Sequence, residues 1–271
     1  MATLVCLHAH PDDEAISTGG TISRAASEGH RIVLVLATDG DHGEVPDDLA
    51  EGETLVDRRR AETMAAAEYL GIARVAWLGY SDSGMNGWDQ NDHDHSFHQA
   101  PLDEAAAKLA TVLREEKADV LTSYDWHGTY GHPDHVKVHH VGARAADLAG
   151  VRLLEATMNR DAMARLVDVA RAEGVEFESP DEEEFDPSAP ADDGNPFGEP
   201  EEAITLEVDV TGFVGRKKAA LACHASQVSE SDFFLKMDDE SFARAFGTEW
   251  FIEPGAPGPM RRGWIFDENG A

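Results

Sequence analysis

The 271-residue sequence predicts an α/β sandwich in which helices cover both faces of a mostly parallel sheet. Short apolar runs alternate with longer amphipathic stretches through the first half of the chain. The clearest apolar run, 31–37, is rich in β-branched residues and apolar on both faces, as strands buried in parallel sheets are. Strands that alternate with helices pair in parallel through right-handed crossovers, which places helices on both sides.

The first half of the chain is predicted to hold five strands with helices between them. Apolar runs give strands at 4–8, 31–37, 74–78, 119–123 and 151–157. The helices 19–28, 57–70 and 133–148 each end at or near a glycine, which suits the left-handed conformation that closes a helix. The helix 57–70 is rich in Ala, Arg and Glu, which favour helix formation. A further helix is expected at 102–116, and Pro133 suits a first helical position.

The second half is less regular. After a helix at 161–173, the segment 176–202 contains twelve acidic residues, five prolines and no Lys or Arg, so we expect an exposed acidic excursion. Alternating polarity then predicts a strand at 204–210, followed by helices at 213–224 and 241–246 and a strand at 249–252. No repeat or second domain is evident, and residues 1–271 are expected to form one domain.

Composition excludes several classes of function. A net charge of −31 repels phosphate backbones, so nucleic acid is not an expected partner. The two cysteines, Cys6 and Cys223, are too few for a disulfide framework or a multi-cysteine zinc cluster. No apolar run is long enough to span a membrane, and no basic region precedes the first one. We therefore expect a cytoplasmic protein.

A His-Pro-Asp-Asp motif follows the first predicted strand. His10 and Asp13, separated by a turn that Pro11 stiffens, can face one point, and imidazole with carboxylate suits a divalent metal. His135 in the later His-Pro-Asp-His motif offers a second imidazole. Two His and one Asp leave positions open for water and substrate, as catalytic metal sites do. Asp12 then stands beside the metal as a general base. The alternative is a turn in which His10 and Asp13 only cap a helix.

The second motif, at 132–135, follows the fourth predicted strand. Ligands in α/β folds bind beyond the carboxyl ends of strands, so the two motifs are expected to meet at one sheet edge. His132 lies at a helix N-terminus, where Asp134 can hydrogen-bond one ring nitrogen and hold the ring protonated or in one tautomer. A cationic His132 and the Tyr130 hydroxyl suit a developing oxyanion. A half-buried loop aromatic is the alternative for Tyr130.

Together the two motifs, Ala9 to Glu14 and Gly131 to His135, resemble the LmbE-like or PIG-L family of zinc-dependent N-acetyl-sugar deacetylases, which includes mycothiol-pathway deacetylases and mycothiol S-conjugate amidases. Further matches are Arg59-Arg60-Ala61-Glu62, Asp82-Ser83-Gly84-Met85, and Lys218 with His224-Ala225-Ser226-Gln227. The resemblance implies a Rossmann-like fold. It implies that His10, Asp13 and His135 bind zinc and that Asp12 is the general base. It also implies that His132, oriented by Asp134, stabilises the tetrahedral intermediate and that Tyr130 donates to the oxyanion. Arg59, Asp82 and Met85 are then expected to contact the substrate.

These observations predict metal-assisted removal of an N-acetyl group from an amino sugar or N-acetylglucosaminyl conjugate. Zn²⁺ is the expected cofactor, and the ligand set also accepts Fe²⁺. The partner is a small N-acetylated sugar, and a homo-oligomer is compatible with the sequence. The polar loop 86–98, which holds three histidines, is expected to shape the substrate rim. The alternatives are a mycothiol S-conjugate amidase, a non-heme iron enzyme, and a metal- or sugar-binding protein without catalysis.

Overall fold

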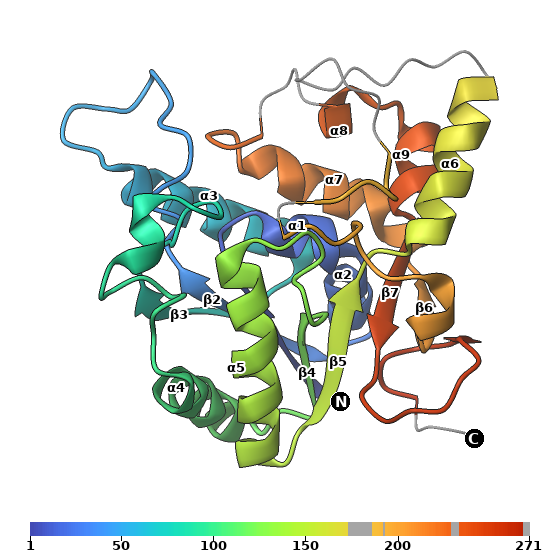
Figure 1. Cartoon of the computed structure of the whole chain (residues 1–271), viewed down its shortest axis with the longest axis horizontal. Helices are drawn as coiled ribbons and strands as arrows, with labels where there is room; N and C mark the ends of the chain where they lie inside the picture. Colours follow the sequence, from blue (N-terminus) through green and yellow to red (C-terminus); the bar gives the residue numbers. More distant parts are fainter. Residues whose placement is uncertain (173–185, 192, 229–232, 268–271) are drawn as a thin grey trace.

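The computed structural model describes residues 1–172, 186–191, 193–228 and 233–267, and this part of the chain contains an eight-stranded sheet. The strand order is β3-β2-β1-β4-β5-β7-β6-β8 (Figure 1). The first five strands in this order pair in parallel, whereas β7 is antiparallel to both β5 and β6. The prediction of an α/β fold with a mostly parallel sheet is confirmed. The strands are β1 (Thr3–His8), β2 (Arg31–Thr38), β3 (Arg74–Tyr80), β4 (Val120–Tyr124), β5 (Arg152–Thr157), β6 (Leu206–Asp209), β7 (Thr248–Ile252) and β8 (Arg261–Arg262).

Helices cover both faces of the sheet. The chain adds β2 and β3 on one side of β1 and later β4 and β5 on the other, and right-handed crossovers in opposite directions place their helices on opposite faces. Helices α2, α3 and α7 pack together on one face, and α4 packs against α5 on the other (Figure 1). The α-helices are α1 (Asp13–Ser17), α2 (Gly19–Ser27), α3 (Leu55–Leu70), α4 (Leu102–Glu116), α5 (Pro133–Ala149), α6 (Arg160–Ala172), α7 (Val214–Cys223), α8 (Phe233–Lys236) and α9 (Asp239–Phe246). Short 3₁₀ helices occur at η1 (Asp89–Asp92), η2 (Glu201–Ala203) and η3 (Thr211–Phe213).

Local sequence explains most helix ends. Helix α3 begins two residues earlier than expected because the Thr54 side chain accepts a hydrogen bond from the Asp57 amide, and the Asp57 carboxylate accepts one from the Thr54 amide. Gly71 and Gly150 end α3 and α5 in the left-handed conformation. Sequence reasoning missed α1, α8 and β8, which are too short to show a periodicity.

The order in which strands join the sheet changes direction at β1: β2 and β3 lie on one side of it, and β4 and β5 on the other. Strands β1 and β4 are neighbours, although their paired residues, such as Leu4 and Val120, lie more than a hundred positions apart. Strand β1 is almost entirely buried, as the continuous apolar run predicted. A crevice forms where strand order reverses, and ligands bind there in doubly wound α/β folds. Both His-Pro-Asp motifs follow these two strands, so the prediction that they meet at one sheet edge is confirmed.

Only part of the described acidic segment is exposed in the way that composition predicted: 186 and 188–190 are exposed, whereas 195–199 lie against the protein. Phe197 is half-buried, and Gly198 and Glu199 are buried. The Arg160 guanidinium donates hydrogen bonds to the carbonyl oxygens of Phe197 and Gly198, which explains how so polar a segment lies against the protein. Residues 173–185 and 192 lie outside the described residues, as does the expected end of the helix at 161–173. Among described helices, none combines the length and apolar character needed to cross a membrane.

Candidate metal centre and active-site cleft

The turn after β1 and the start of α5 bring the predicted metal ligands together. The Asp13 Oδ2 atom lies 3.5 Å from His10 Nδ1 and 3.4 Å from His135 Nε2. The ring centroids of His10 and His135 are 5.4 Å apart. All three residues come from the segments that follow β1 and β4, and His10 and His135 are buried. The structure thus places His10, Asp13 and His135 as a compact group of donors.

The donor chemistry fits a divalent cation. The Nδ1 atom of His135 lies 3.3 Å from the Gly128 carbonyl oxygen, a contact that places the ring proton on Nδ1. Its Nε2 atom is buried, lies 3.4 Å from Asp13 Oδ2, and makes no geometrically good hydrogen bond to any described residue. Burial raises the pKa of Asp13, but the interactions with His135 and His10 outweigh burial, and the pKa of Asp13 is well below its usual range. An unpartnered imidazole nitrogen beside an ionised carboxylate is what a metal site needs.

Further acidic groups surround His10. Its Nε2 atom lies 3.2 Å from Asp134 Oδ2 and 3.5 Å from Asp82 Oδ1. Burial lowers the pKa of His10, but Asp82, Asp13 and Asp134 together raise it well above its usual value. Two sets of potential ligand atoms lie within 4.8 Å of one another in the described chain: His10 with His132 and His135, and His10 with Asp82 and Asp134. Asp13 belongs to neither set, so the predicted ligand set of His10, Asp13 and His135 stays a prediction.

Asp12 occupies a strained turn beside this group. Its φ of 106° lies in the region that favours glycine, and strain of this kind costs about 1–3 kcal/mol unless the surroundings enforce it. The Asp12 amide donates to Glu14 Oε2 at 3.0 Å, and the Arg59 guanidinium lies 3.2 Å from Asp12 Oδ2. Burial raises the pKa of Asp12 to about 6, against the opposing effect of Arg59. Burial therefore makes the Asp12 carboxylate more basic than that of an exposed aspartate.

Arg59 and Asp82, both expected to contact substrate, make protein contacts. Arg59 is 3% exposed and donates to the carbonyl oxygens of Pro11 and Gly40, so it fixes the turn that holds Asp12. Asp82 accepts the Gly84 amide and approaches His10. Burial raises the pKa of Asp82, yet His10 and the Gly84 amide lower it far below its usual range. Both residues still line the cleft.

Asp134 does not orient His132 through its carboxylate as expected. That carboxylate accepts the Ser83 amide at 2.9 Å, the Ser83 hydroxyl, and the contact from His10. The backbone amide of Asp134 donates to His132 Nδ1 at 3.1 Å, because His132 caps α5. Burial, with His10 and His135, lowers the pKa of His132 to about 3. His132 is therefore a neutral ring with its proton on Nε2, rather than the cation that we expected.

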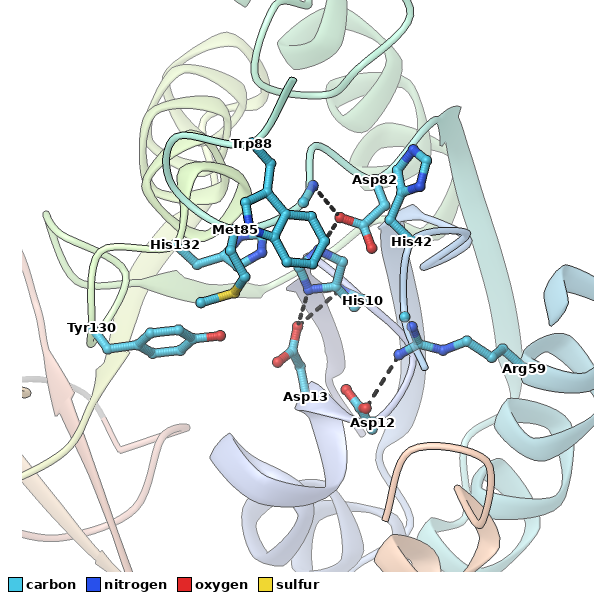
Figure 2. Close-up of a pocket in the computed structure, with 12 residues that line it drawn as sticks. His10, Asp12, Asp13, His42, Arg59, Asp82, Met85, Trp88, Tyr130 and His132 are labelled. Atoms are coloured by element: carbon cyan, nitrogen blue, oxygen red, sulfur yellow. Dashed lines mark hydrogen bonds and ion pairs between the residues drawn. The ribbon is translucent and has the colours of Figure 1, made fainter. Parts of the chain in front are cut away.

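An open cleft of about 200 Å³ lies over these groups. It is lined by His10, Asp12, Asp13, His42, Gly43, Arg59, Asp82, Gly84, Met85, Trp88, Tyr130 and His132. Figure 2 shows the Tyr130 hydroxyl directed toward Asp13 from the side opposite Arg59. Met85 and Trp88 also line the cleft. The Tyr130 ring contacts the ring of His135 edge-to-face, with centroids 4.9 Å apart.

Sequence reasoning missed His42 and Gly43 as lining residues, and it gave Gly84 no role in the cleft beyond its place in a matched motif. His42 follows the end of β2 closely, and this position was the signal available for it. Trp88 belongs to the loop that was expected to form the rim, and it is 48% exposed. The three histidines at 93–98 are not among the residues that line the cleft.

Fold and site together define an α/β protein with a candidate metal centre at the topological switch point of its sheet. The chain belongs to the PIG-L family: the family model described as GlcNAc-PI de-N-acetylase matches residues 5–146. The family assignment predicted from the two His-Pro-Asp motifs is confirmed.

Individual relatives agree with this assignment. The chain is 38% identical, over 92% of its length and 88% of the relative's, to the 1D-myo-inositol 2-acetamido-2-deoxy-alpha-D-glucopyranoside deacetylase of Acidothermus cellulolyticus. The N,N'-diacetylchitobiose deacetylase of Pyrococcus horikoshii has a similar fold, with a TM-score of 0.56, 22% identity and coverage of 93% of this chain and 82% of that one.

A 4-carboxy-2-hydroxymuconate hydratase from Pseudomonas putida also has this fold, with a TM-score of 0.55, 18% identity and coverage of 96% of this chain and 99% of that one. Proteins of one fold carry different reactions, and structural likeness at such identities shows the fold alone. The reaction must therefore be argued from the residues of the site.

Proposed function

We propose that this protein is a zinc-dependent deacetylase that hydrolyses the N-acetyl group of an N-acetylglucosaminyl conjugate, with the inositol glycoside as the first substrate to test. The observation that carries the proposal is the position of Asp12: a carboxyl group with a pKa of about 6 stands beside His10 and Asp13, opposite the hydroxyl of Tyr130. The relative from Acidothermus cellulolyticus, which is 38% identical to this chain, supports the choice of substrate.

His10, Asp13 and His135 would hold the metal. Zinc is the ion that we propose, because imidazole and carboxylate ligands suit it. The same ligands also accept iron(II). When bound, such an ion lowers the pKa of a coordinated water and polarises a carbonyl oxygen. His132, Asp82 and Asp134 also approach His10, but the hydrogen bonds that Asp134 and Asp82 accept from Ser83 and Gly84 favour a supporting role for these two carboxylates.

The protein groups then divide the work of amide hydrolysis. Asp12 accepts a proton from the attacking water, whose oxygen bonds to the acetyl carbon. His132, through its Nε2 proton, and Tyr130, through its hydroxyl, donate hydrogen bonds to the oxygen that becomes negative. Asp12 returns its proton to the amine nitrogen as the C–N bond breaks, which yields acetate and the free amine. Arg59 holds the Asp12 turn in place through the carbonyl oxygens of Pro11 and Gly40.

The size of the cleft limits what it encloses. At about 200 Å³ it is smaller than the roughly 300–1,000 Å³ typical of drug-sized ligands. We infer that the acetamido sugar enters the cleft and the aglycone lies over the rim, where Trp88 offers a half-exposed aromatic face. Met85 and the free carboxylate edge of Asp82 face the sugar. We also propose that the chain acts as one domain, because β6 and β7 extend the sheet that β1 to β5 form.

An amine-release assay with fluorescamine tests the proposal. The zinc-loaded protein is given N-acetylglucosaminyl-inositol, other N-acetylglucosamine glycosides and free N-acetylglucosamine, and acetate is measured in parallel. We expect equal amounts of acetate and amine from the glycosides. Release of amine only from a thiol conjugate with a larger acyl group would instead identify an amidase, and no release from any substrate would refute the reaction.

A further inference from the structure

The loop 125–131, between β4 and α5, carries Tyr130 in an unfavourable backbone. Thr129, which precedes Tyr130, has a φ of 72°, in the region that favours glycine, and Gly128 and Gly131 also have positive φ. A non-glycine residue in this region persists only where its surroundings enforce it. The position of Tyr130 therefore depends on whatever packs against its loop.

The segment 193–199 provides that packing. The Gly198 amide donates to the Thr129 carbonyl oxygen at 2.7 Å, next to Tyr130 in the chain. His127 contacts the segment with both ring nitrogens: Nε2 lies 3.3 Å from the Gly198 carbonyl oxygen, and Nδ1 lies 3.4 Å from Asp193 Oδ2. The Trp126 indole donates to Glu199. Trp126, His127 and Thr129 of the Tyr130 loop thus contact one short segment.

Phe197 contacts Tyr130 itself. The two rings are nearly parallel, with an interplanar angle of 15° and centroids 6.3 Å apart, within the range of aromatic pairs. The Tyr130 ring also contacts the edges or faces of His135 and His132, at 4.9 and 6.2 Å. Tyr130 is thus fixed by aromatic neighbours from the candidate metal centre and from the 193–199 segment.

The segment is in turn anchored to the rigid sheet. Arg160, at the start of α6, donates to the carbonyl oxygens of Phe197 at 2.9 Å and Gly198 at 2.6 Å. The Glu199 amide donates to the Met158 carbonyl oxygen just beyond β5, and the Arg160 amide donates to Glu199 in return. A restraint on Tyr130 therefore runs from β5 and α6 through this segment.

We propose that the segment 193–199 is a positioning element for Tyr130, and that Phe197 is the residue that sets where the Tyr130 hydroxyl lies. This rests on the proposed function, in which Tyr130 donates a hydrogen bond to the developing oxyanion. Phe197 is not among the residues that line the cleft, so its effect passes through Tyr130. Part of a segment whose composition indicated only an exposed acidic excursion thus has a positioning role.

A double-mutant cycle tests the proposal. Loss of one oxyanion donor costs roughly 10²–10³-fold in kcat, so Tyr130→Phe sets the upper limit. Phe197→Ala leaves the donor present but loosely held, and we expect roughly a tenfold lower kcat with KM changed less than about twofold. In the Tyr130→Phe background, Phe197→Ala should have no further effect, because the group that it positions is gone. Phe197→Leu, which keeps most of the apolar contact, should recover most of the activity.

Two measurements separate this role from a loss of folding. Phe266→Ala removes another half-buried phenylalanine, stacked on His30 at the opposite end of the sheet, and should leave kcat unchanged. Zinc content and the unfolding temperature are measured for every variant. If Phe197→Ala lowers kcat equally in both backgrounds, or not at all, the positioning role is wrong while the proposed reaction stands. A fully active Tyr130→Phe would overturn both this proposal and the assigned role of Tyr130.

Discussion

Replacing Asp12 with Asn is expected to remove the general base and leave its surroundings intact. Arg59 loses its contact with the Asp12 carboxylate at 3.2 Å, but it keeps its hydrogen bonds to Pro11 and Gly40. The amide of residue 12 can still donate to Glu14. The turn, and with it His10 and Asp13, should therefore stay in place, and the variant should still bind zinc.

The size of the effect follows from the role and from the pKa. A positioned general base contributes roughly 10²–10⁴-fold to the rate, which corresponds to about 3–5 kcal/mol of activation free energy. With a pKa of about 6, Asp12 is largely ionised at pH 7.5 and is basic enough to accept a proton there. We therefore expect kcat to fall at least about a hundredfold at that pH, with little change in KM.

The assay measures amine release at saturating substrate, with the zinc content of each sample determined beside it. Asp39→Asn is a matched control, because Asp39 follows β2 at the same sheet edge and pairs with the half-exposed Arg60 at 2.7 Å. This control should keep the activity of the unaltered protein. A zinc-loaded Asp12→Asn protein with more than about one-tenth of that kcat would refute Asp12 as the base.

Other substitutions test the metal ligand, the rim and a distant ion pair. His135→Gln should weaken zinc binding at least about tenfold in calorimetric titrations, and unchanged affinity would remove His135 from the ligand set. Trp88→Ala should raise KM for a glycoside about tenfold and leave kcat within about twofold, whereas an unchanged KM would place the aglycone elsewhere. Glu116 pairs with Arg31 at 2.6 Å, which with Arg74 lowers the pKa of Glu116 to about 2. Because this pKa is depressed, the stabilisation is present above about pH 4.5 and is lost as pH falls toward 2. Glu116→Gln should lower the free energy of unfolding by about 1 kcal/mol at pH 7, a small effect because both arginines are more than one-third exposed. Urea unfolding of the variant and the unaltered protein, at pH 7 and near pH 2, should show this difference in stability disappear in acid.

Much of the fold could be predicted from short stretches of sequence. Apolar runs located the parallel strands, and the glycines that end α3 and α5 located the turns, because these signals depend only on neighbouring residues. The strand β8 and the short helices could not be found in this way. They contain too few residues for a period, and β8 forms through its pairing with β6, which the sequence does not reveal.

The sequence by itself determined which residue types would meet. Two motifs, each following a predicted strand, had to reach one edge of a doubly wound sheet, and His10, Asp13 and His135 do so. Residue type and spacing were enough for this prediction because strand direction and crossover handedness leave few arrangements.

Only the tertiary structure decided how these residues interact. Asp134 directs its carboxylate to Ser83 and His10 rather than to His132, and the pKa of His132 falls because the ring is buried. The contact between Phe197 and Tyr130 also joins segments that no local pattern connects. Hydrogen bonds and burial depend on distances of a few ångströms between residues far apart in the chain, and those distances exist only once the sheet has assembled.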